Sequence, residues 1–481
     1  MKKFTKTLAG ILAGLTMLSG CGTEQATEGV ETVTWYVPML ITGNGKQEVL
    51  DKVNDILETK YNLKLDLIGI DSGNYNNKMQ VMNAGQEEYD LAFTSHWKNS
   101  YSTNVSNGVF YELTEEDLKK YAPKTYESMS DNVWKAVKID GKIYAVPNWQ
   151  IQTRAACIYT PKEFLDETGE SLENIKTLDD ITGYLRKVQA IHPNCNKIKA
   201  MWTQLMPYYN MIEIYEEKMP GAIVFNKEGK PEVINQYDTQ EFTDYIDLRQ
   251  DWVAEGLCTD KYLPDSNADK KEIKEEPIWV HVYSPGGDAI LSQSRGYEMV
   301  FKQFSNAVMS STGVTAALTG ISATSKNPTA ALKMIEVINT DAEVHNLLSY
   351  GIEGVDYVKT SENQIERKEE KTFRGVDNWM MGTIANTYLL SNQSPTLIEE
   401  TKAFNDEAMP SPLLGFNANV DNLTLEISNC KTVINEYLEM LDLGLSDDAK
   451  LAEFRAKLDE AGVDKIVSEL QSQIDEWYAA Q

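Results

Sequence analysis

The sequence has few of the residues and motifs that carry catalysis or bind metals. Only four histidines occur, and none forms an H-E-x-x-H motif or another close metal-binding pair. A P-loop, a G-x-S-x-G motif and an EF-hand loop are also missing. We therefore predict no catalytic residues, no metal site and no cofactor, and we expect that the protein is not an enzyme.

Basic residues are scarce relative to acidic ones. The chain has 45 lysines and arginines against 73 aspartates and glutamates, which gives a formal net charge of −28. Such a chain repels phosphate backbones, so we exclude nucleic-acid binding. A pair of neighbouring carboxylates is expected from this composition alone. A surface-anchored glycoside hydrolase, which needs such a pair, therefore remains only the less favoured alternative.

Cysteines are few and widely spaced. One of the five, Cys21, lies near the N-terminus, and no C-x-x-C pair is present. The other four allow two disulfides in an exported protein, but their spacing does not pair them, and isolated buried thiols are favoured. These four are Cys157, Cys195, Cys258 and Cys430.

Long apolar runs are also lacking. The apolar stretch Leu8–Leu18 is too short to span a bilayer, and it follows three lysines and no acid, which is typical of a signal peptide over residues 1–20. It ends in Leu18-Ser19-Gly20-Cys21, which matches the bacterial lipobox. We therefore predict cleavage before Cys21 and lipid attachment to its thiol, rather than an ordinary signal peptide followed by a chance cysteine.

The segment after Cys21 is polar and has no apolar periodicity. Residues 21–32 are expected to be a flexible tether that reaches on the order of 20 Å. The sequence thus predicts a lipoprotein on the extracellular face of the cell membrane.

Strands and helices alternate in the first part of the mature chain. Thr32–Val37, Leu63–Ile70 and Tyr89–Phe93 have strand character, and helical spacing follows each of the first two. This order predicts a parallel sheet, in which ligands meet the loops at the carboxyl ends of the strands. The C-terminal part is predicted to be helical, with breaks near Asp447 and at Gly462.

Several motifs resemble one known family. Gly141-Lys-Ile-Tyr-Ala-Val-Pro147 resembles a G-K-x-Y-x-x-P crossover between lobes, and Tyr89-Asp-Leu-Ala-Phe-Thr94 resembles a D-[IL]-x-F-T strand end. Gly320 to Pro328 is similar to an S-K-N-P helix start, and Gly351 to Tyr357 to a G-I-E-G-x-x-Y stretch. With the lipobox, these motifs resemble the carbohydrate-type extracellular solute-binding lipoproteins of ABC importers, in a Gram-positive subfamily with a helical C-terminal extension.

The resemblance implies an α/β, periplasmic-binding-protein-like fold, with two α/β lobes, a ligand cleft and a hinge. We place the first lobe at 33–150 and 285–345, and the second at 151–284 and 346–481, including a helical extension at about 415–481. The implied function is to capture a sugar or oligosaccharide between the lobes and deliver it to an ABC transporter permease. We expect a monomer, and a peptide or other nutrient receptor on the same scaffold is the alternative.

A sugar site needs aromatic rings for the apolar faces of the sugar and polar side chains for its hydroxyls. We expect such residues where strands end, beside the first crossover, and in the part of the second lobe that would close the cleft. We interpret Trp134, Trp202, Trp252 and Trp279 as core residues, and Trp477 as part of the C-terminal helix packing. The predicted ligand-binding residues are Trp35, Tyr36, Asp71, Thr94, Ser95, Trp97, Asn148, Trp149, Arg374 and Trp379.

Overall fold

The first sheet has the strand–helix alternation that the sequence predicts. The computed structural model describes residues 29–259 and 275–480. Strands β1 (Glu31–Val37), β2 (Leu63–Gly69) and β3 (Leu91–Thr94) run parallel, and α1 (Lys46–Tyr61) and α2 (Ser72–Ala84) connect them. Alternate residues of β1 are buried, as expected for a strand with one face in the core. The predicted parallel sheet is confirmed.

Two strands from distant parts of the chain complete this sheet, whose order is β2-β1-β3-β11-β4. Strand β11 (Leu318–Ile321) runs antiparallel to both neighbours, β3 and β4 (Ala145–Pro147). Asn327 caps the helix that follows β11 by accepting a hydrogen bond from the Ala330 amide at 3.0 Å. The capped helix is α14 (Pro328–Thr340). Besides α1, α2 and α14, this first lobe contains α3 (Tyr101–Ser106), α4 (Glu115–Tyr121), α5 (Pro123–Glu127), α6 (Asp131–Val137), α13 (Ser311–Val314) and α15 (Ala342–Tyr350).

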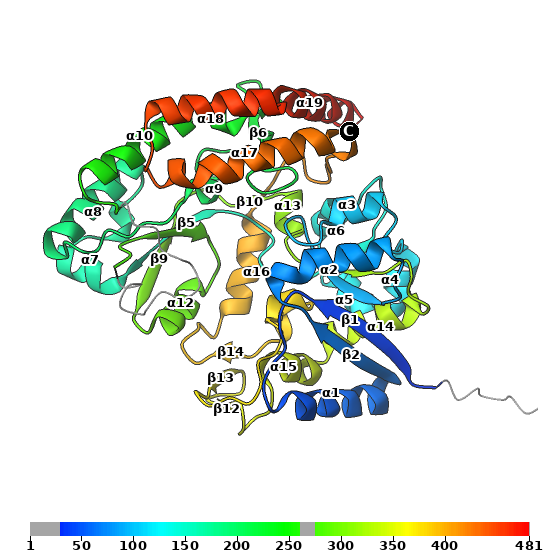
Figure 1. Ribbon diagram of the computed structural model, residues 1–481. Coiled ribbons are helices and arrows are strands. Elements are labelled where there is room, and N and C mark those ends of the chain that lie inside the picture. Colours follow the sequence, from blue (N-terminus) through cyan, green and yellow to red (C-terminus); the bar gives the residue numbers. More distant parts are fainter. Residues whose placement is uncertain (1–28, 260–274, 481) are drawn as a thin grey trace, which may run out of the picture.

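A second, smaller sheet lies in the other lobe, on the left in Figure 1. All six residues of β5 (Ala156–Pro161) are buried, and both edges of this strand are paired antiparallel, with β8 (Trp279–Val282) and β9 (Met299–Gln303). The second lobe also contains α7 (Lys162–Thr168), η1 (Leu172–Asn174), α8 (Leu178–Ile191), α9 (Trp202–Leu205), β6 (Ala222–Phe225), β7 (Pro231–Ile234), η2 (Gln236–Asp238), α10 (Gln240–Ala254) and α12 (Gly287–Arg295).

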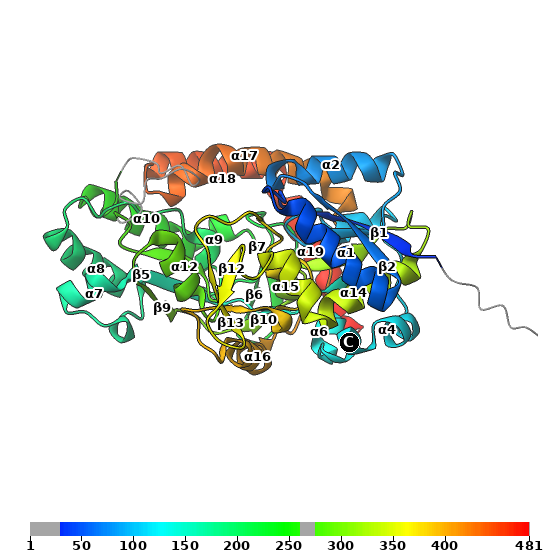
Figure 2. The same cartoon turned by 90° about the horizontal axis from the view of Figure 1, so that it is seen from below.

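Three C-terminal helices pack on the second lobe. They are α17 (Thr424–Asp442), α18 (Asp448–Ala461) and α19 (Val463–Ala479), preceded by η5 (Asp421–Leu423). Gly462 joins the last two with a φ of 96°, in the left-handed region that glycine adopts without strain. Their apolar faces share one core with the second sheet. Figure 2 shows the end of α19 beside α6 of the first lobe, and the Lys135 ammonium of α6 lies 5.9 Å from the Trp477 ring of α19.

Three segments cross between the lobes and lie next to one another. The first contains Arg154, whose backbone pairs with Val308 through N–O distances of 2.9 and 3.0 Å. The second contains β10 (Val308–Met309), which pairs in parallel with β15 (Met409–Pro410) of the third. Before this third crossing the chain forms β12 (Tyr357–Lys359), β13 (Gln364–Arg367) and η3 (Asn378–Met380), and the third segment itself carries η4 (Ile384–Asn386), β14 (Leu389–Leu390) and α16 (Leu397–Glu407).

The two hydrophobic cores divide the chain differently from the predicted lobe limits. Helix α12 and strand β9 were predicted in the first lobe, but β9 pairs with β5 because the central, fully buried strand needs partners on both edges. Leu348, Phe373 and Met381 were predicted in the second lobe, but they lie in the core of the first. The chain therefore returns to the first lobe near β10, and after Met381 only Ala408 and Leu414 still contribute to its core.

Three cysteine thiols are free: Cys157, Cys258 and Cys430 are all buried and form no disulfide. For these three, the prediction of isolated buried thiols is confirmed. The predicted signal peptide, Cys21 and most of the tether lie outside the described residues. Within residues 29–259 and 275–480, no helix is long and apolar enough to cross a membrane.

Candidate functional site

The loop after β3 is a tight turn that points one tryptophan outward. Thr94 and Ser95 are fully buried, and their hydroxyls are used inside the turn. The Thr94 hydroxyl donates to the Asn99 carbonyl at 2.5 Å, and the Lys98 amide donates to Ser95 Oγ at 2.8 Å. The prediction that Thr94 and Ser95 contact a ligand is therefore wrong for this conformation, because both hydroxyls are buried in the turn that positions Trp97.

Trp97 and Trp379 lie against each other on the first lobe, whereas Trp379 was predicted in the part of the second lobe that would close the cleft. Their ring centroids are 6.3 Å apart, and Phe93 lies 6.1 Å from the first ring and 5.9 Å from the second. The Trp97 indole nitrogen donates to the Ala316 carbonyl at 2.9 Å, which fixes the ring while 37% of the residue stays exposed. A held, exposed indole offers an apolar face without paying much side-chain entropy on binding.

The first crossover supports this pair of tryptophans. Asn148 is only 2% exposed, and its amide donates to the Trp379 carbonyl at 3.2 Å while accepting from Thr319 Oγ1 at 3.1 Å. Asn148 thus holds Trp379 and is not free to bind a ligand, which corrects its predicted role. Trp149 is half-buried against the first core, and its carbonyl accepts from the Ile384 amide at 2.9 Å.

Four other predicted residues lie apart from the tryptophan pair. Trp35 is 1% exposed and belongs to the first core, so its predicted ligand contact is wrong. Strand alternation sends Tyr36 to the other side, where it meets the edge of the Tyr89 ring. Asp71 caps α2 by accepting from the Gly73 amide at 3.0 Å. Arg374 is exposed, and its backbone pairs with that of Thr42.

A hollow of about 400 Å³ lies between Trp97 and the second lobe; we name it the Trp97 cavity. Asn76, Trp97 and Thr103 line it from the first lobe, while Glu216 and Lys431 line it from the second. Glu216 and Lys431 form an ion pair. The cavity therefore combines an aromatic face, amide and hydroxyl groups, one positive charge and one negative charge.

A hollow of about 300 Å³ lies at the crossing segments, and we name it the crossover cavity. It shares Thr312 with the Trp97 cavity. Arg154 lines it, and the Arg154 Nη2 lies 3.2 Å from Nε2 of His96 in the first lobe. Because arginine only donates, this nitrogen of His96 must accept. Burial, helped by the Arg154 charge, lowers the pKa of His96 to about 3, so the ring is neutral.

Glu213 faces the same crossover cavity from the second lobe. Burial raises the pKa of its carboxyl to about 7, although the positive charge of Arg154 acts in the opposite direction. The Lys218 amide donates to this carboxyl at 3.1 Å. His96 of the first lobe and Glu213 of the second lobe, both titratable, therefore lie beside Arg154, where the chain passes between the lobes.

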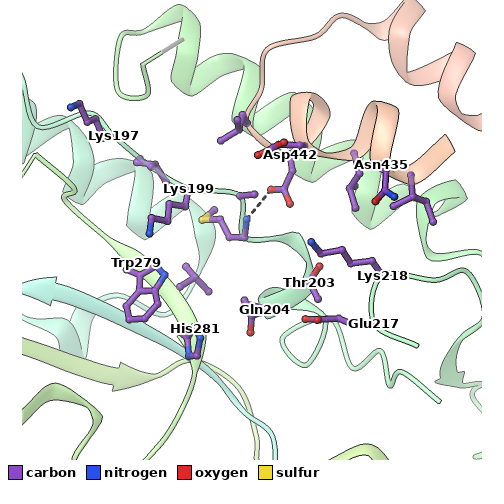
Figure 3. Close-up of a pocket in the computed structure, with 18 of the residues that line it drawn as sticks. Lys197, Lys199, Thr203, Gln204, Glu217, Lys218, Trp279, His281, Asn435 and Asp442 are labelled. Carbon is purple, nitrogen blue, oxygen red and sulfur yellow. Dashed lines mark hydrogen bonds between the residues drawn. The ribbon is translucent and has the colours of Figure 1, made fainter. Parts of the chain in front are cut away.

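A third hollow, of about 500 Å³, lies in the second lobe; we name it the Trp279 cavity. Figure 3 shows Trp279 and His281 of β8 on one side, and Asn435 and Asp442 of α17 on the other. It shares Thr203 and Gln204 with the crossover cavity. The three hollows thus form a series with common lining residues, from Trp97 past the crossing segments to Trp279.

Sequence reasoning missed part of this series. Trp134, Trp202 and Trp252 are buried as predicted, but Trp279 is only half-buried and lines a cavity. A strand of four residues gives too little alternation to show which face is open. The position of Arg154 could have been predicted to lie at the cavity, since it is seven residues beyond the crossover motif that ends at Pro147. Glu213 lies in an irregular segment, and no sequence pattern indicates its place at the cavity.

Known proteins resemble the chain over most of its length. A curated carbohydrate ABC transporter substrate-binding protein of Streptococcus pneumoniae serotype 4 is 26% identical over 504 aligned residues, covering 99% of this chain and 98% of the relative. The crystal structure of the N-glycan transport solute binding protein NgtS from Streptococcus pneumoniae has a TM-score of 0.82 at 23% identity, covering 93% of this chain and 99% of that chain.

A more distant structure, the alginate-binding protein AlgQ2, has a TM-score of 0.63 at 14% identity, covering 93% of this chain and 99% of that chain. These likenesses confirm the predicted fold of two α/β lobes. A family model described as a domain of unknown function matches residues 412–479, which include the three C-terminal helices. A model described as bacterial extracellular solute-binding protein matches residues 52–351. This match covers more than half of the 481 residues, and the chain therefore belongs to the family of bacterial extracellular solute-binding proteins.

Proposed function

We propose that this protein captures an oligosaccharide between its two lobes and delivers it to the permease of an ABC importer. The observation that carries the proposal is Trp97, which lines a polar cavity between the lobes and packs against Trp379. Indole faces pack on the C–H faces of sugar rings, while amides, hydroxyls and charged groups bind the hydroxyl rim. Few other ligands need both surfaces at once.

The relatives support this class of ligand. The curated relative is described as a carbohydrate ABC transporter substrate-binding protein. NgtS has been solved in complex with Man1GlcNAc and with Man5GlcNAc. The series of three hollows fits a ligand of several rings better than a single sugar, because it extends from the first lobe past the crossing segments into the second lobe.

We propose binding without turnover. The support is the description of the curated relative as a substrate-binding protein. The competing class is a glycosidase, which would use two acids on opposite sides of the scissile bond. Incubating the purified protein with the glycans that it binds, followed by chromatography, should return them intact. Released monosaccharide would contradict this part of the proposal.

We propose that lipid on Cys21 holds the protein at the membrane, and that residues 22–32 form a leash to the folded body. The support is the lipobox Leu18-Ser19-Gly20-Cys21 after a basic, apolar leader. A Cys21→Ala variant should lose its label in cells fed radioactive palmitate and should appear in the culture medium. Equal labelling of the variant and the wild type would contradict the anchor.

A thermal-shift panel tests the ligand class. The panel contains monosaccharides, Man1GlcNAc, Man5GlcNAc, other oligosaccharides, and short peptides as the competing class. A ligand that binds only the folded state raises the melting temperature by mass action. We expect oligosaccharides to raise it and peptides to leave it unchanged. A shift with peptides and with no glycan would overturn the proposal in favour of a peptide receptor.

A further inference from the structure

Helix α17 carries a polar stripe along two of the three hollows. Its members follow one another at intervals of four, three, four and four residues, which places them on one face of a helix. All five are exposed. They are Thr424, Ser428, Lys431, Asn435 and Glu439, and we name them the α17 stripe.

The two ends of the stripe meet different tryptophans. Thr424, Ser428 and Lys431 line the Trp97 cavity, so they lie across it from the first lobe. Asn435 and Glu439 line the Trp279 cavity, and Figure 3 shows Asn435 on the opposite side from Trp279. At 1.5 Å per residue, the stripe is about 22 Å long, which exceeds the size of a single sugar ring.

The opposite face of α17 is anchored. Cys430, Ile434, Tyr437 and Leu441 are buried in the second core, beside α18 and α19. At the C-terminal end, the Asp442 carboxylate accepts from the Met201 and Trp202 amides at 2.8 and 3.1 Å. A rigid helix therefore presents the stripe. Binding to a rigid surface costs little conformational entropy of the protein.

The C-terminal helices also contact the first lobe. The Asn417 amide donates to the Lys138 carbonyl at 2.6 Å, and the Gly415 amide donates to Ser311 Oγ at 2.9 Å. The ammonium of Lys135 lies 5.9 Å from the Trp477 ring. The loop before α17 and the end of α19 thus contact the first lobe, and the lining of the Trp97 cavity sets the N-terminal part of α17 opposite that lobe.

We propose that the α17 stripe is a wall of the ligand site, and that the C-terminal helices, matched so far only to a domain of unknown function, bind the hydroxyl rim of the oligosaccharide. The inference rests on the proposed function and deepens it. Sugar rings would stack on Trp97 at one end and on Trp279 at the other, while hydroxyl, amide and charged groups of α17 bind the side that faces the helix. Ligands of several rings would then depend on α17 more than short ones do.

Calorimetric titration of the mature protein tests this, with Man5GlcNAc as the long probe and Man1GlcNAc as the short one. The variant Ser428→Ala/Asn435→Ala removes two polar groups, one from each cavity. Each lost hydrogen bond is worth about 1 kcal/mol, so the Kd for Man5GlcNAc should rise by about 30-fold. The Kd for Man1GlcNAc should rise by less. Ser428→Phe should weaken the long probe by filling the Trp97 cavity.

The matched control is Asn429→Ala/Glu436→Ala, which removes polar groups from exposed positions of α17 that line neither cavity. It should bind both probes like the wild type. Unliganded melting temperatures close to that of the wild type show that each variant is folded. Wild-type affinity for Man5GlcNAc in both Ser428→Ala/Asn435→Ala and Ser428→Phe would overturn the α17 wall alone. A wild-type protein that binds no glycan of the panel would overturn the proposed function as well.

Discussion

Single residues at the candidate site divide into those that would touch a ligand and those that hold them. Trp97 is exposed but fixed through its indole nitrogen, whereas Ser95 and Asn148 are buried and shape the surroundings of the two tryptophans. Sequence reasoning grouped these residues correctly by location, because they follow β3 and the first crossover. It could not separate the two roles, since these depend on which hydroxyls and amides the turn itself uses.

Trp97→Ala should weaken oligosaccharide binding while leaving the protein folded. Aromatic residues that form the centre of a binding surface typically cost about 2 kcal/mol or more on truncation, which is a factor of about 30 in Kd. The ring is 37% exposed, so its loss leaves the first core almost intact. Titration calorimetry with a glycan that binds the wild type measures the effect.

Tyr111→Ala is the matched control for this variant, because Tyr111 is a similarly exposed aromatic residue, 40% accessible, that lines none of the three hollows. We expect it to bind like the wild type. If Trp97→Ala also retained full affinity, the ligand would have to bind somewhere other than the Trp97 cavity.

Glu213 should make stability depend on pH. Burial raises the pKa of its carboxyl from 4.5 to about 7 in the folded protein, so the folded state binds the proton more tightly than the unfolded chain. The stability from this group is therefore fully present below about pH 4.5 and is lost as the pH rises through 7. Glu213→Gln removes this loss but keeps an oxygen that can accept from the Lys218 amide.

The expected result is a higher melting temperature for Glu213→Gln than for the wild type at pH 8, and a much smaller difference at pH 5. The pKa of His96 is about 3 in the folded protein against the ordinary 6.5, so His96 also makes stability depend on pH. Because both proteins contain His96, its contribution cancels when their melting temperatures are compared. Parallel melting curves of the two proteins from pH 5 to 8 would show that Glu213 does not carry a raised pKa.

At the scale of elements, local sequence patterns were sufficient to predict most helices and the first three strands. Asn327 and Pro328 begin α14 as their cap and first-turn positions predict, and the C-terminal helices break near Asp447 and at Gly462. The insertion of β11 between β3 and β4 was not predictable, since it pairs residues about 170 apart with β4 and about 230 apart with β3 along the chain.

Asp356 links two elements that lead to Trp379, and its removal should destabilise the first lobe. The residue is 1% exposed, and its carboxylate accepts from the Thr372 and Phe373 amides at 2.6 and 3.0 Å and from the Ile352 amide at 2.9 Å. Asp356→Ala leaves these donors without a partner, which costs about 3 kcal/mol. Denaturant unfolding of the variant should show the loss.

Glu353→Ala is the control for Asp356→Ala, because Glu353 is an exposed acid in the same loop whose ion pair with Lys359, at 3.8 Å, lies at the surface. Its unfolding should match that of the wild type within about 0.5 kcal/mol. Equal stability of the two variants would mean that the Asp356 carboxylate does not hold the loop.

The described residues form two large cores, with a small third cluster around Tyr159 in the second lobe, and three adjacent crossing segments join the lobes. Such a connection allows the lobes to rotate about the line of Arg154, β10 and β15 without breaking either core. The presence of two lobes was predictable from family resemblance. The limits of the lobes were not, because the need of β5 for two partners decides where α12 and β9 lie.

Small-angle X-ray scattering with and without a saturating glycan tests the central claim, that the ligand is held between the lobes. The glycan is the tightest binder of the panel, and calorimetry establishes saturation. A ligand that touches both lobes stabilises the closed arrangement, so the radius of gyration should fall on binding. An unchanged radius of gyration at full saturation would contradict capture between the lobes.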